Sequence, residues 1–388
     1  MPKLAIDGGV PVFPQNTEIV RRNKYSNKEI EAVARVIENG VLSSFRGGCE
    51  VKCFEREFAS FINSKYALAT TSGTTALHTA VASFGFSQNS EVLVPAVTFV
   101  STASVVLQEG LTPVFVDIDE NFCMDPKDLE RKITKLSCAI IPVHLYGHPA
   151  QMQEINNIAK QNGLIVIEDA CQSHGAVYHG IKTGALGDIG CFSFYETKNM
   201  SCGEGGMITC SNMEIFDRLC LVKEHGSPRT SKTWYSYERL GYNYNMTEVQ
   251  AAIGRIQLQV LEKNNQARRD NVNIYRNILN GLDLELPNYS SEVVCVSHNL
   301  PILLPESLAE NRNFIVDALR AEGVPIDIAY PQPLYKTTLF QKLKLYSYCP
   351  RAENVTARLF TLFTDNSIDE KIIELTAEAI KKVVSYLK

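Results

Sequence analysis

Leu164-Ile-Val-Ile-Glu-Asp169 is the stretch that decides the fold class of this chain. An apolar run of this kind is typical of a strand that is buried on both faces, as in parallel sheets covered by helices. Similar short apolar runs lie on both sides of it, at residues 66–70, 91–95, 113–117, 138–144, 191–194 and 206–210. Amphipathic segments at residues 74–84, 101–108 and 152–162 separate several of these strands. The alternation predicts an α/β domain built on a largely parallel sheet.

Asp169 stands where its strand ends, and this position predicts a ligand-binding role. Right-handed crossovers place the carboxyl ends of parallel strands along one rim, where α/β domains bind their ligands. A carboxylate there needs a partner, because an unpaired buried charge is costly. Gln172 offers an amide from the same loop. Ser193 lies between two phenylalanines of a later strand, so its hydroxyl faces away from their rings, and Lys198 follows just beyond that strand.

The segment Thr71-Ser-Gly-Thr-Thr75 lies between a predicted strand and a predicted helix. Backbone N–H groups at a helix N-terminus, with hydroxyls beside them and a glycine that allows close approach, form a cradle for an anion. Each feature alone has a simpler interpretation, as a helix cap, a strand-end acid or a solvated lysine. Together, the cradle, the acid, the amide and the lysine match the phosphate, ring nitrogen, phenolic oxygen and aldehyde of pyridoxal 5'-phosphate, PLP.

A second, smaller domain is predicted in the C-terminal third of the chain. A long helix is expected to begin after Thr247, because apolar residues recur at helical spacing from Ala252 to Leu261. We therefore predict an N-terminal arm and large PLP-binding domain at residues 1–254 and a small domain at residues 255–388. The last helix is expected to open with a capping box, Ser367-Ile-Asp-Glu370.

Composition narrows the class of protein. The 388 residues carry a formal net charge of −5, which argues against a nucleic acid or an anionic membrane as the main partner. No apolar run reaches the roughly 18 residues of a membrane span, and the first residues do not resemble a secretory signal, so we expect a cytoplasmic protein.

The 11 cysteines are scattered and are expected to be free thiols. No metal site is expected, because His144 and His148 flank a turn rather than share a helix face.

Several motifs make the chain resemble the DegT/DnrJ/EryC1/StrS family of PLP-dependent sugar and aminocyclitol aminotransferases, and the resemblance extends over nearly the whole length. These motifs are Thr71-Ser-Gly-Thr-Thr-Ala-Leu-His, Val94-Pro-Ala-Val-Thr-Phe, Pro142-Val-His-Leu-Tyr-Gly, Glu168-Asp-Ala-Cys-Gln-Ser-His-Gly, Phe192-Ser-Phe-Tyr-Glu-Thr-Lys-Asn-Met, Gly203-Glu-Gly-Gly, the segment from Gly241 to Gly254, and Tyr330-Pro-Gln-Pro-Leu-Tyr.

The resemblance implies the fold of the aspartate aminotransferases, fold type I. Its large domain would contain a mostly parallel seven-stranded sheet, followed by a smaller α+β domain. The implied cofactor is PLP, with pyridoxamine 5'-phosphate as the intermediate form of the cofactor. The family also implies a homodimer with active sites at the subunit interface.

The resemblance assigns roles to individual residues. Lys198 would hold the cofactor covalently and move protons, and Asp169 would keep the ring nitrogen protonated. The other implied cofactor contacts are Gln172 at the phenolic oxygen, Gly73, Thr74 and Ser193 at the phosphate, Phe99 against the ring face, and Asn243 at the phosphate of the neighbouring subunit.

Three residues are expected to touch substrate. His174 lies close to Gln172 in the chain, and Arg229 lies in a basic segment at residues 223–232, which could equally be a solvated connector. Tyr335 stands where many members of the family have histidine, so contacts to substrate are expected to differ there.

The activity implied is transfer of an amino group from glutamate or glutamine to a keto sugar, most simply a nucleotide-linked one, for a glycan such as O-antigen lipopolysaccharide or for a natural product. Three alternatives stay open: an aminotransferase for a cyclitol ketone, a PLP-dependent sugar dehydratase or lyase, and a regulator without enzymatic activity. Lys198 argues against the sugar 3-dehydratases of the family, which carry histidine at that position.

Overall fold

A seven-stranded sheet forms the centre of the computed structural model, which describes residues 3–14, 25–228 and 236–387. The strand order is β1-β9-β8-β5-β4-β2-β3. The strands are β1 (Tyr66–Thr70), β2 (Glu91–Pro95), β3 (Thr112–Val116), β4 (Ser137–Ile140), β5 (Ile165–Asp169), β8 (Ile189–Ser193) and β9 (Gly206–Cys210). β9 runs antiparallel to both of its neighbours, whereas the other pairings are parallel. The predicted mostly parallel sheet is confirmed.

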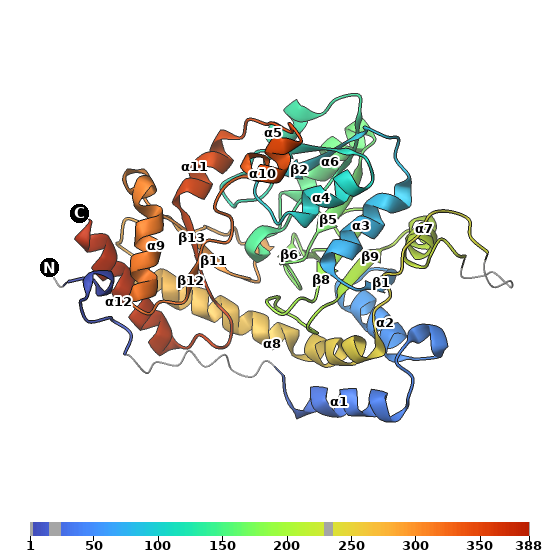
Figure 1. The fold of residues 1–388 in the computed structure, drawn as a ribbon, viewed down its shortest axis with the longest axis horizontal. Helices are drawn as coiled ribbons and strands as arrows, with labels where there is room; N and C mark the ends of the chain where they lie inside the picture. Colours follow the sequence, from blue (N-terminus) through green and yellow to red (C-terminus); the bar gives the residue numbers. More distant parts are fainter. Residues whose placement is uncertain (1–2, 15–24, 229–235, 388) are drawn as a thin grey trace.

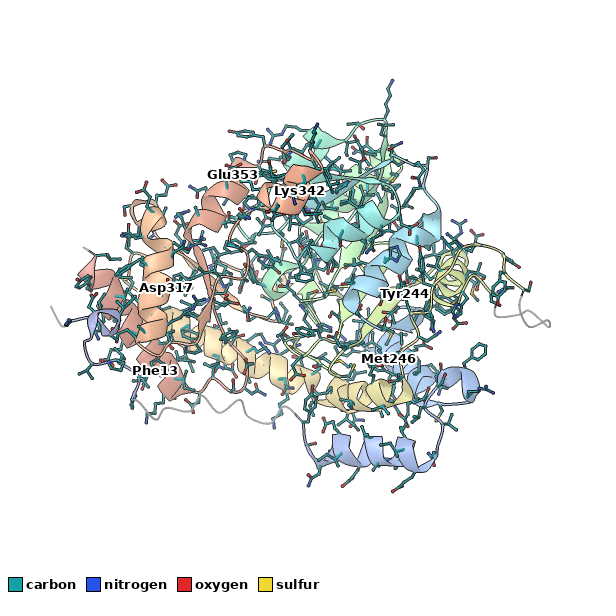
Figure 2. The ribbon with its side chains drawn as sticks, in the orientation of Figure 1. Phe13, Tyr244, Met246, Asp317, Lys342 and Glu353 are labelled. Carbon is teal, nitrogen blue, oxygen red and sulfur yellow. The ribbon has the colours of Figure 1, made fainter. Side chains whose placement is uncertain are left out.

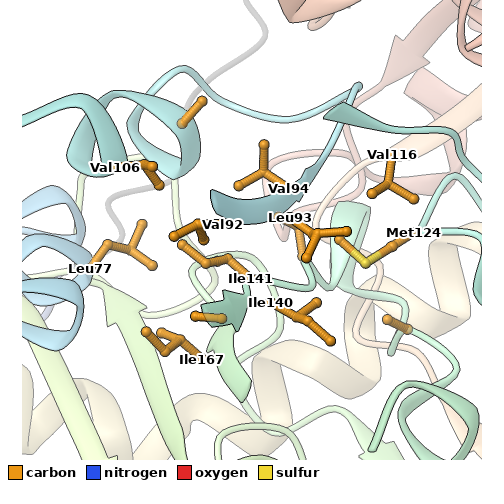
Figure 3. Packing of buried hydrophobic residues seen from close by; sticks show 14 of the residues in the cluster. Leu77, Val92, Leu93, Val94, Val106, Val116, Met124, Ile140, Ile141 and Ile167 are labelled. Atoms are coloured by element: carbon orange, nitrogen blue, oxygen red, sulfur yellow. The ribbon is translucent and has the colours of Figure 1, made fainter. Parts of the chain in front are cut away.

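Helices cover the sheet and bury its apolar side chains. The described helices of this half are α1 (Asn27–Glu38), α2 (Glu50–Ile62), α3 (Gly73–Phe84), α4 (Ser101–Gln108), α5 (Pro126–Lys132), α6 (Met152–Asn162) and α7 (Met213–Lys223). Figure 3 shows Leu77 of α3 and Val106 of α4 packed with Val92 of β2 and Ile167 of β5. Such a core is the expected product of apolar strands alternating with amphipathic helices.

The two faces of β8 pack against different helices. Cys191 belongs to the cluster that includes Leu77 of α3. Phe192, the next residue, packs with Phe58 of α2, with ring centroids 4.9 Å apart. Because side chains alternate along a strand, Ser193 returns to the α3 face, away from the phenylalanine rings. The predicted orientation of the Ser193 hydroxyl therefore follows from the strand itself.

The helix α8 (Glu248–Leu279) connects the two halves of the chain. Thr247 caps it, and Gln250 completes the capping box. Its first half contributes Leu261 to the cluster around α2, and its second half contributes Val272 to a separate C-terminal cluster. Figure 1 shows α8 extending beneath both halves, with α1 alongside. The predicted boundary at residue 254 falls inside this continuous helix, so the domain division stays a prediction.

The C-terminal half contains a three-stranded antiparallel sheet, ordered β11-β13-β12. The elements here are β11 (Leu300–Leu303), α9 (Arg312–Ala321), β12 (Ile326–Asp327), α10 (Thr338–Lys342), α11 (Pro350–Arg358), β13 (Leu359–Leu362) and α12 (Glu370–Tyr386). A further small sheet joins β10 (Val293–Val294), β6 (Val177–Tyr178) and β7 (Ile181–Lys182). Leu4 and Phe13 from the beginning of the chain pack into the C-terminal core, and Figure 2 shows Phe13 beside α12.

The predicted capping box of the last helix is wrong. The N-cap of α12 is Asp369, whose carboxylate accepts a hydrogen bond from the Ile372 N–H at 3.1 Å. Ser367 instead donates both its N–H and its hydroxyl to Asp365. Asp365 therefore forms the turn before the helix, and Asp369, which lies nearer the helix, forms the N-cap.

Two other features bear on the class of protein. All 11 cysteines are free thiols, as predicted. Within the three described ranges, no helix is both long enough and apolar enough to cross a lipid bilayer.

Candidate active site

The carboxylate of Asp169 forms the floor of the candidate site. It ends β5 and is buried, with 5% of its surface exposed. The Thr102 hydroxyl donates to Oδ2 at 2.8 Å, and the Cys171 N–H donates to Oδ1 at 3.2 Å. Both donors are neutral, and no ion pair to Asp169 is present among the described residues. A buried carboxylate with only neutral donors is suited to binding a cationic group of a ligand.

The side chain of Gln172 is held at both ends. Its Oε1 accepts the Tyr146 N–H at 3.0 Å, and its Nε2 donates to the Tyr330 hydroxyl at 2.9 Å. Tyr330 comes from the C-terminal half, three residues after the end of β12, and the sequence analysis did not single it out as a site residue. The only sequence signal was its place at the start of the motif Tyr330-Pro-Gln-Pro.

The backbone at Gly73 lies close to the side chains of Ser193 and Cys171, at the place where the sequence predicts an anion cradle. Gly73 is the first residue of α3, and a Cβ atom there would lie 2.6 Å from Ser193 Cβ and 2.9 Å from Cys171 Sγ. The neighbouring Thr74 hydroxyl is 2.6 Å from that of Ser101, the first residue of α4. The structure thus brings together the starts of α3 and α4 with the end of β8. Backbone N–H groups and hydroxyls converge there, as phosphate binding requires.

Lys198 follows β8 in an irregular turn and is half buried. Burial lowers the pKa of its amine, while the charges of Cys171 and Asp169 act in the opposite direction. The influence of Asp169 on this pKa is consistent with the position of Lys198 after β8, the strand that pairs with β5. A lowered pKa increases the neutral fraction of an amine, the form that acts as nucleophile and base.

Phe99 and Asn243 are both exposed. The Phe99 side chain is 59% exposed just before α4, next to Val100, which is also exposed, whereas residues 92–98 are buried. Asn243 lies in the segment before α8, between Tyr242 and Tyr244, whose rings are stacked with centroids 5.1 Å apart. The Tyr244 hydroxyl is 3.0 Å from His78 Nδ1 of α3, and Figure 2 shows Tyr244 beside that helix.

The structure does not bring two of the three expected substrate residues, His174 and Tyr335, to this site. His174 is fully buried and packs against Phe192 and Phe194, on the opposite face of β8 from Ser193. Tyr335 is 2% exposed, and its hydroxyl donates to Glu353 at 2.6 Å. Arg229 lies outside the described residues.

His144 has a structural role that its sequence position did not reveal. Its Nδ1 accepts the Ala150 N–H at 3.0 Å, so its Nε2 must donate to the buried Glu168 carboxylate at 2.9 Å. Glu168 also accepts three backbone N–H groups, from residues 184, 186 and 187. This network holds the loop before β8. No cluster of three or more side chains that could hold a metal ion occurs in the described part of the chain.

These residues fit PLP. The cradle at Gly73 has no room for a side chain, and Asp169 accepts hydrogen bonds from the neutral groups of Thr102 and Cys171. Gln172 follows β5 and Lys198 follows β8, which pairs with β5. A dianionic phosphate, a protonated ring nitrogen, a phenolic oxygen and an aldehyde would meet complementary groups in this order.

Gly73→Ala is expected to weaken PLP binding by about tenfold or more, because the added methyl group would occupy the space between α3 and Ser193. Titration of the apoprotein with PLP, followed by visible absorbance, measures this loss. Gly85→Ala is the matched control, because a Cβ at Gly85 meets no atom within 4 Å, although its positive φ of +60° costs some stability. Equal PLP affinity in Gly73→Ala and wild type would show that the cradle is elsewhere.

Comparisons of sequence and of structure with known proteins identify the same family of aminotransferases. The sequence profile described as the DegT/DnrJ/EryC1/StrS aminotransferase family matches residues 23–387. The chain is 37% identical over 344 residues to UDP-N-acetyl-3-dehydro-alpha-D-glucosamine 3-aminotransferase of Acidithiobacillus ferrooxidans, covering 88% of this chain and 90% of that protein. It is 32% identical to GDP-perosamine synthase of Escherichia coli O157:H7, covering 93% and 96% of the two chains. The crystal structure of DesV from S. venezuelae superimposes with a TM-score of 0.85 at 31% identity, covering 92% and 94%.

Proposed function

The chain belongs to the DegT/DnrJ/EryC1/StrS aminotransferase family and is a PLP-dependent aminotransferase, and from this premise we propose that its amino acceptor is the ketone of a nucleotide-linked sugar. Glutamate or glutamine is the proposed amino donor. The names of two relatives support the acceptor class, since one specifies a UDP-linked 3-dehydro sugar and the other a GDP-linked amino sugar. The product would be an amino sugar for a glycan such as lipopolysaccharide or for a natural product.

The observation that supports the proposal is that four different chemical groups come from the ends of β5 and β8 and the start of α3. They are the Asp169 carboxylate, the Gln172 amide, the Gly73–Ser193 cradle and the Lys198 amine. When bound, PLP supplies an electron sink that stabilises negative charge on the carbon next to the amine. An anion site alone would need only the cradle, so the acid and the amine together favour this cofactor.

We assign the chemical roles as follows. Lys198 would hold the cofactor covalently and, once released from it, would take a proton from the amino donor in one half-reaction and return a proton in the other; the lowered pKa of its amine suits this role. Asp169 keeps the ring nitrogen protonated, and Thr102 fixes the orientation of that carboxylate. Gln172 donates to the phenolic oxygen. Gly73, Thr74 and Ser193 would hold the phosphate, and the exposed Phe99 ring would lie against the cofactor.

We further propose a homodimer whose two sites lie at the subunit interface, with residues 1–254 as the cofactor domain and residues 255–388 as the small domain. In this arrangement the exposed Asn243 contributes to the phosphate site of the partner subunit. Sedimentation equilibrium tests the dimer. Mixing an inactive Lys198 variant with an inactive Asn243 variant tests the shared site, because a heterodimer then contains one intact site and regains activity.

The reaction is tested in two steps with the purified holoprotein. Glutamate or glutamine should replace the visible band of bound PLP by the near-ultraviolet band of pyridoxamine 5'-phosphate. Addition of UDP-, GDP- or dTDP-linked keto sugars should then restore the visible band and yield an amino sugar detectable by mass spectrometry. A protein that keeps its visible band with every amino donor is not acting as a transaminase, and the lyase alternative would then be preferred.

A further inference from the structure

The orientation of the Gln172 amide follows from its hydrogen bonds. A backbone N–H can only donate, so the atom that receives the Tyr146 N–H must be the amide oxygen. The amide nitrogen therefore faces Tyr330 and carries two hydrogens, one of which is used by the phenol oxygen at 2.9 Å. Among the residues that the structure describes, Tyr330 is the acceptor of this nitrogen, so its second hydrogen is available to a ligand.

Tyr146 is fixed in an unusual conformation on one side of this amide. Its φ of +55° lies in the left-handed region, which is rare for a bulky residue and costs on the order of 1–3 kcal/mol. It is 2% exposed, and besides its N–H bond to Gln172 its carbonyl accepts the His298 N–H at 2.9 Å. The strained residue is thus bound to the site loop on one side and to the C-terminal half on the other.

Tyr330 completes the contact from the C-terminal half. Its ring packs against Tyr146, with centroids 5.9 Å apart. Burial raises the pKa of the Tyr330 phenol, the hydrogen bond from Gln172 lowers it, and the charges of Asp169 and Cys171 raise it further. The net shift is upward, so the phenol is neutral at physiological pH and accepts the Gln172 hydrogen bond as an uncharged oxygen.

We propose that Tyr330 is a positioning residue that fixes the Gln172 amide and thereby couples the placement of the C-terminal half to the cofactor ring. This inference rests on the proposed function, in which Gln172 donates to the phenolic oxygen of PLP. Removal of the phenol leaves the amide bound at one end only, so it can rotate and its second hydrogen is no longer directed. Displacement of the segment after β12 would have the same effect.

The test is Tyr330→Phe, which removes one oxygen atom and keeps the ring that packs against Tyr146. Negative charge on the phenolic oxygen stabilises the proton on the neighbouring lysine–cofactor link, and a hydrogen-bond donor to that oxygen reduces this stabilisation. Tyr330→Phe weakens the donor, so the proton is held more tightly. The absorption midpoint, which is the pH at the midpoint of the titration of the visible band, should therefore rise by about 0.4 to 1 unit. PLP should also bind about threefold to tenfold more weakly. Both quantities are measured on the holoprotein without turnover.

Tyr335→Phe is the matched control, because Tyr335 is a buried tyrosine of the same segment whose hydroxyl donates to Glu353 rather than to Gln172. It should leave the absorption midpoint and the PLP affinity unchanged. Gln172→Leu should shift both quantities at least as far as Tyr330→Phe does. The double variant Gln172→Leu/Tyr330→Phe should match Gln172→Leu alone, because Tyr330 acts through the amide.

Two results would overturn the inference. An absorption midpoint in Tyr330→Phe equal to that of wild type would mean that the phenol does not position Gln172. A shift that persists in the Gln172→Leu background would mean that Tyr330 acts on the cofactor directly. Failure of the proposed function is distinguishable from both, because the wild-type protein would then keep its visible band with every amino donor. Failure to bind PLP is distinguishable as well, because the wild-type protein would then show no visible band.

Discussion

Lys198→Ala should lower turnover by at least about 10³-fold and abolish covalent retention of PLP, because one amine serves as covalent anchor, acid and base. Borohydride treatment of the wild-type holoprotein should fix the cofactor on the peptide that contains Lys198, whereas the variant should yield no labelled peptide. Lys198→Arg should behave in the same way, since a guanidinium keeps the positive charge but does not form the link.

The matched control for this prediction is Lys182→Ala. Burial also lowers the pKa of Lys182, but this lysine lies on β7 above the Phe61 ring, 4.0 Å from its centroid. The control should retain labelling at position 198 and most of the turnover. A borohydride label on another lysine in the wild-type protein would falsify the assignment of Lys198.

Asp169→Asn is expected to have the second-largest effect. Its amide can still bond Thr102 and the Cys171 N–H, so the fold should persist, but it cannot hold a proton on the ring nitrogen. Turnover should fall by about 10²- to 10⁴-fold. Loss of a charge-assisted hydrogen bond of about 1.5–3 kcal/mol should weaken PLP binding about tenfold to a hundredfold. Steady-state kinetics and PLP titration measure the two effects.

Asp119→Asn is the matched control for Asp169→Asn, because it removes the charge of a buried carboxylate that lies outside the candidate site. Asp119 is also buried and also accepts neutral donors, namely two backbone N–H groups and the Gln151 amide. Burial raises its pKa to about 6, despite these hydrogen bonds. This variant should retain PLP affinity and turnover. Similar losses in both variants would mean that Asp169 is important for folding rather than for the cofactor.

The sequence predicts best those parts of the site that lie close together along the chain. Asp169 and Gln172 share one loop, and the place of that loop follows from the rule that parallel strands present their carboxyl ends on one rim. Gly73 and Ser193 come from different strand ends on the same rim, so the topology also predicts that they meet. The helix α4 (Ser101–Gln108) and the strand β9 (Gly206–Cys210) have the predicted bounds for the same local reasons.

The remaining contacts could not be predicted, because they depend on packing between distant segments. Tyr330 is 158 residues from Gln172, and Thr102 is 67 residues from Asp169. His174 shows a second reason. It lies in a turn beside Gly175, whose φ is +84°, so the alternation of a strand does not give the direction of its side chain. Proximity to Gln172 along the chain therefore did not imply a place in the same cavity.

The continuity of α8 has a mechanical consequence for the enzyme. At 1.5 Å per residue, its 32 residues make a rod about 48 Å long, anchored at one end by α2 and at the other by α12. A bend of about 5° at its midpoint would move the far end by about 2 Å, enough to break a hydrogen bond. Because α8 packs against elements of both halves, a small bend in this one helix would be enough to separate hydrogen-bonded partners that belong to different halves, such as Gln172 and Tyr330.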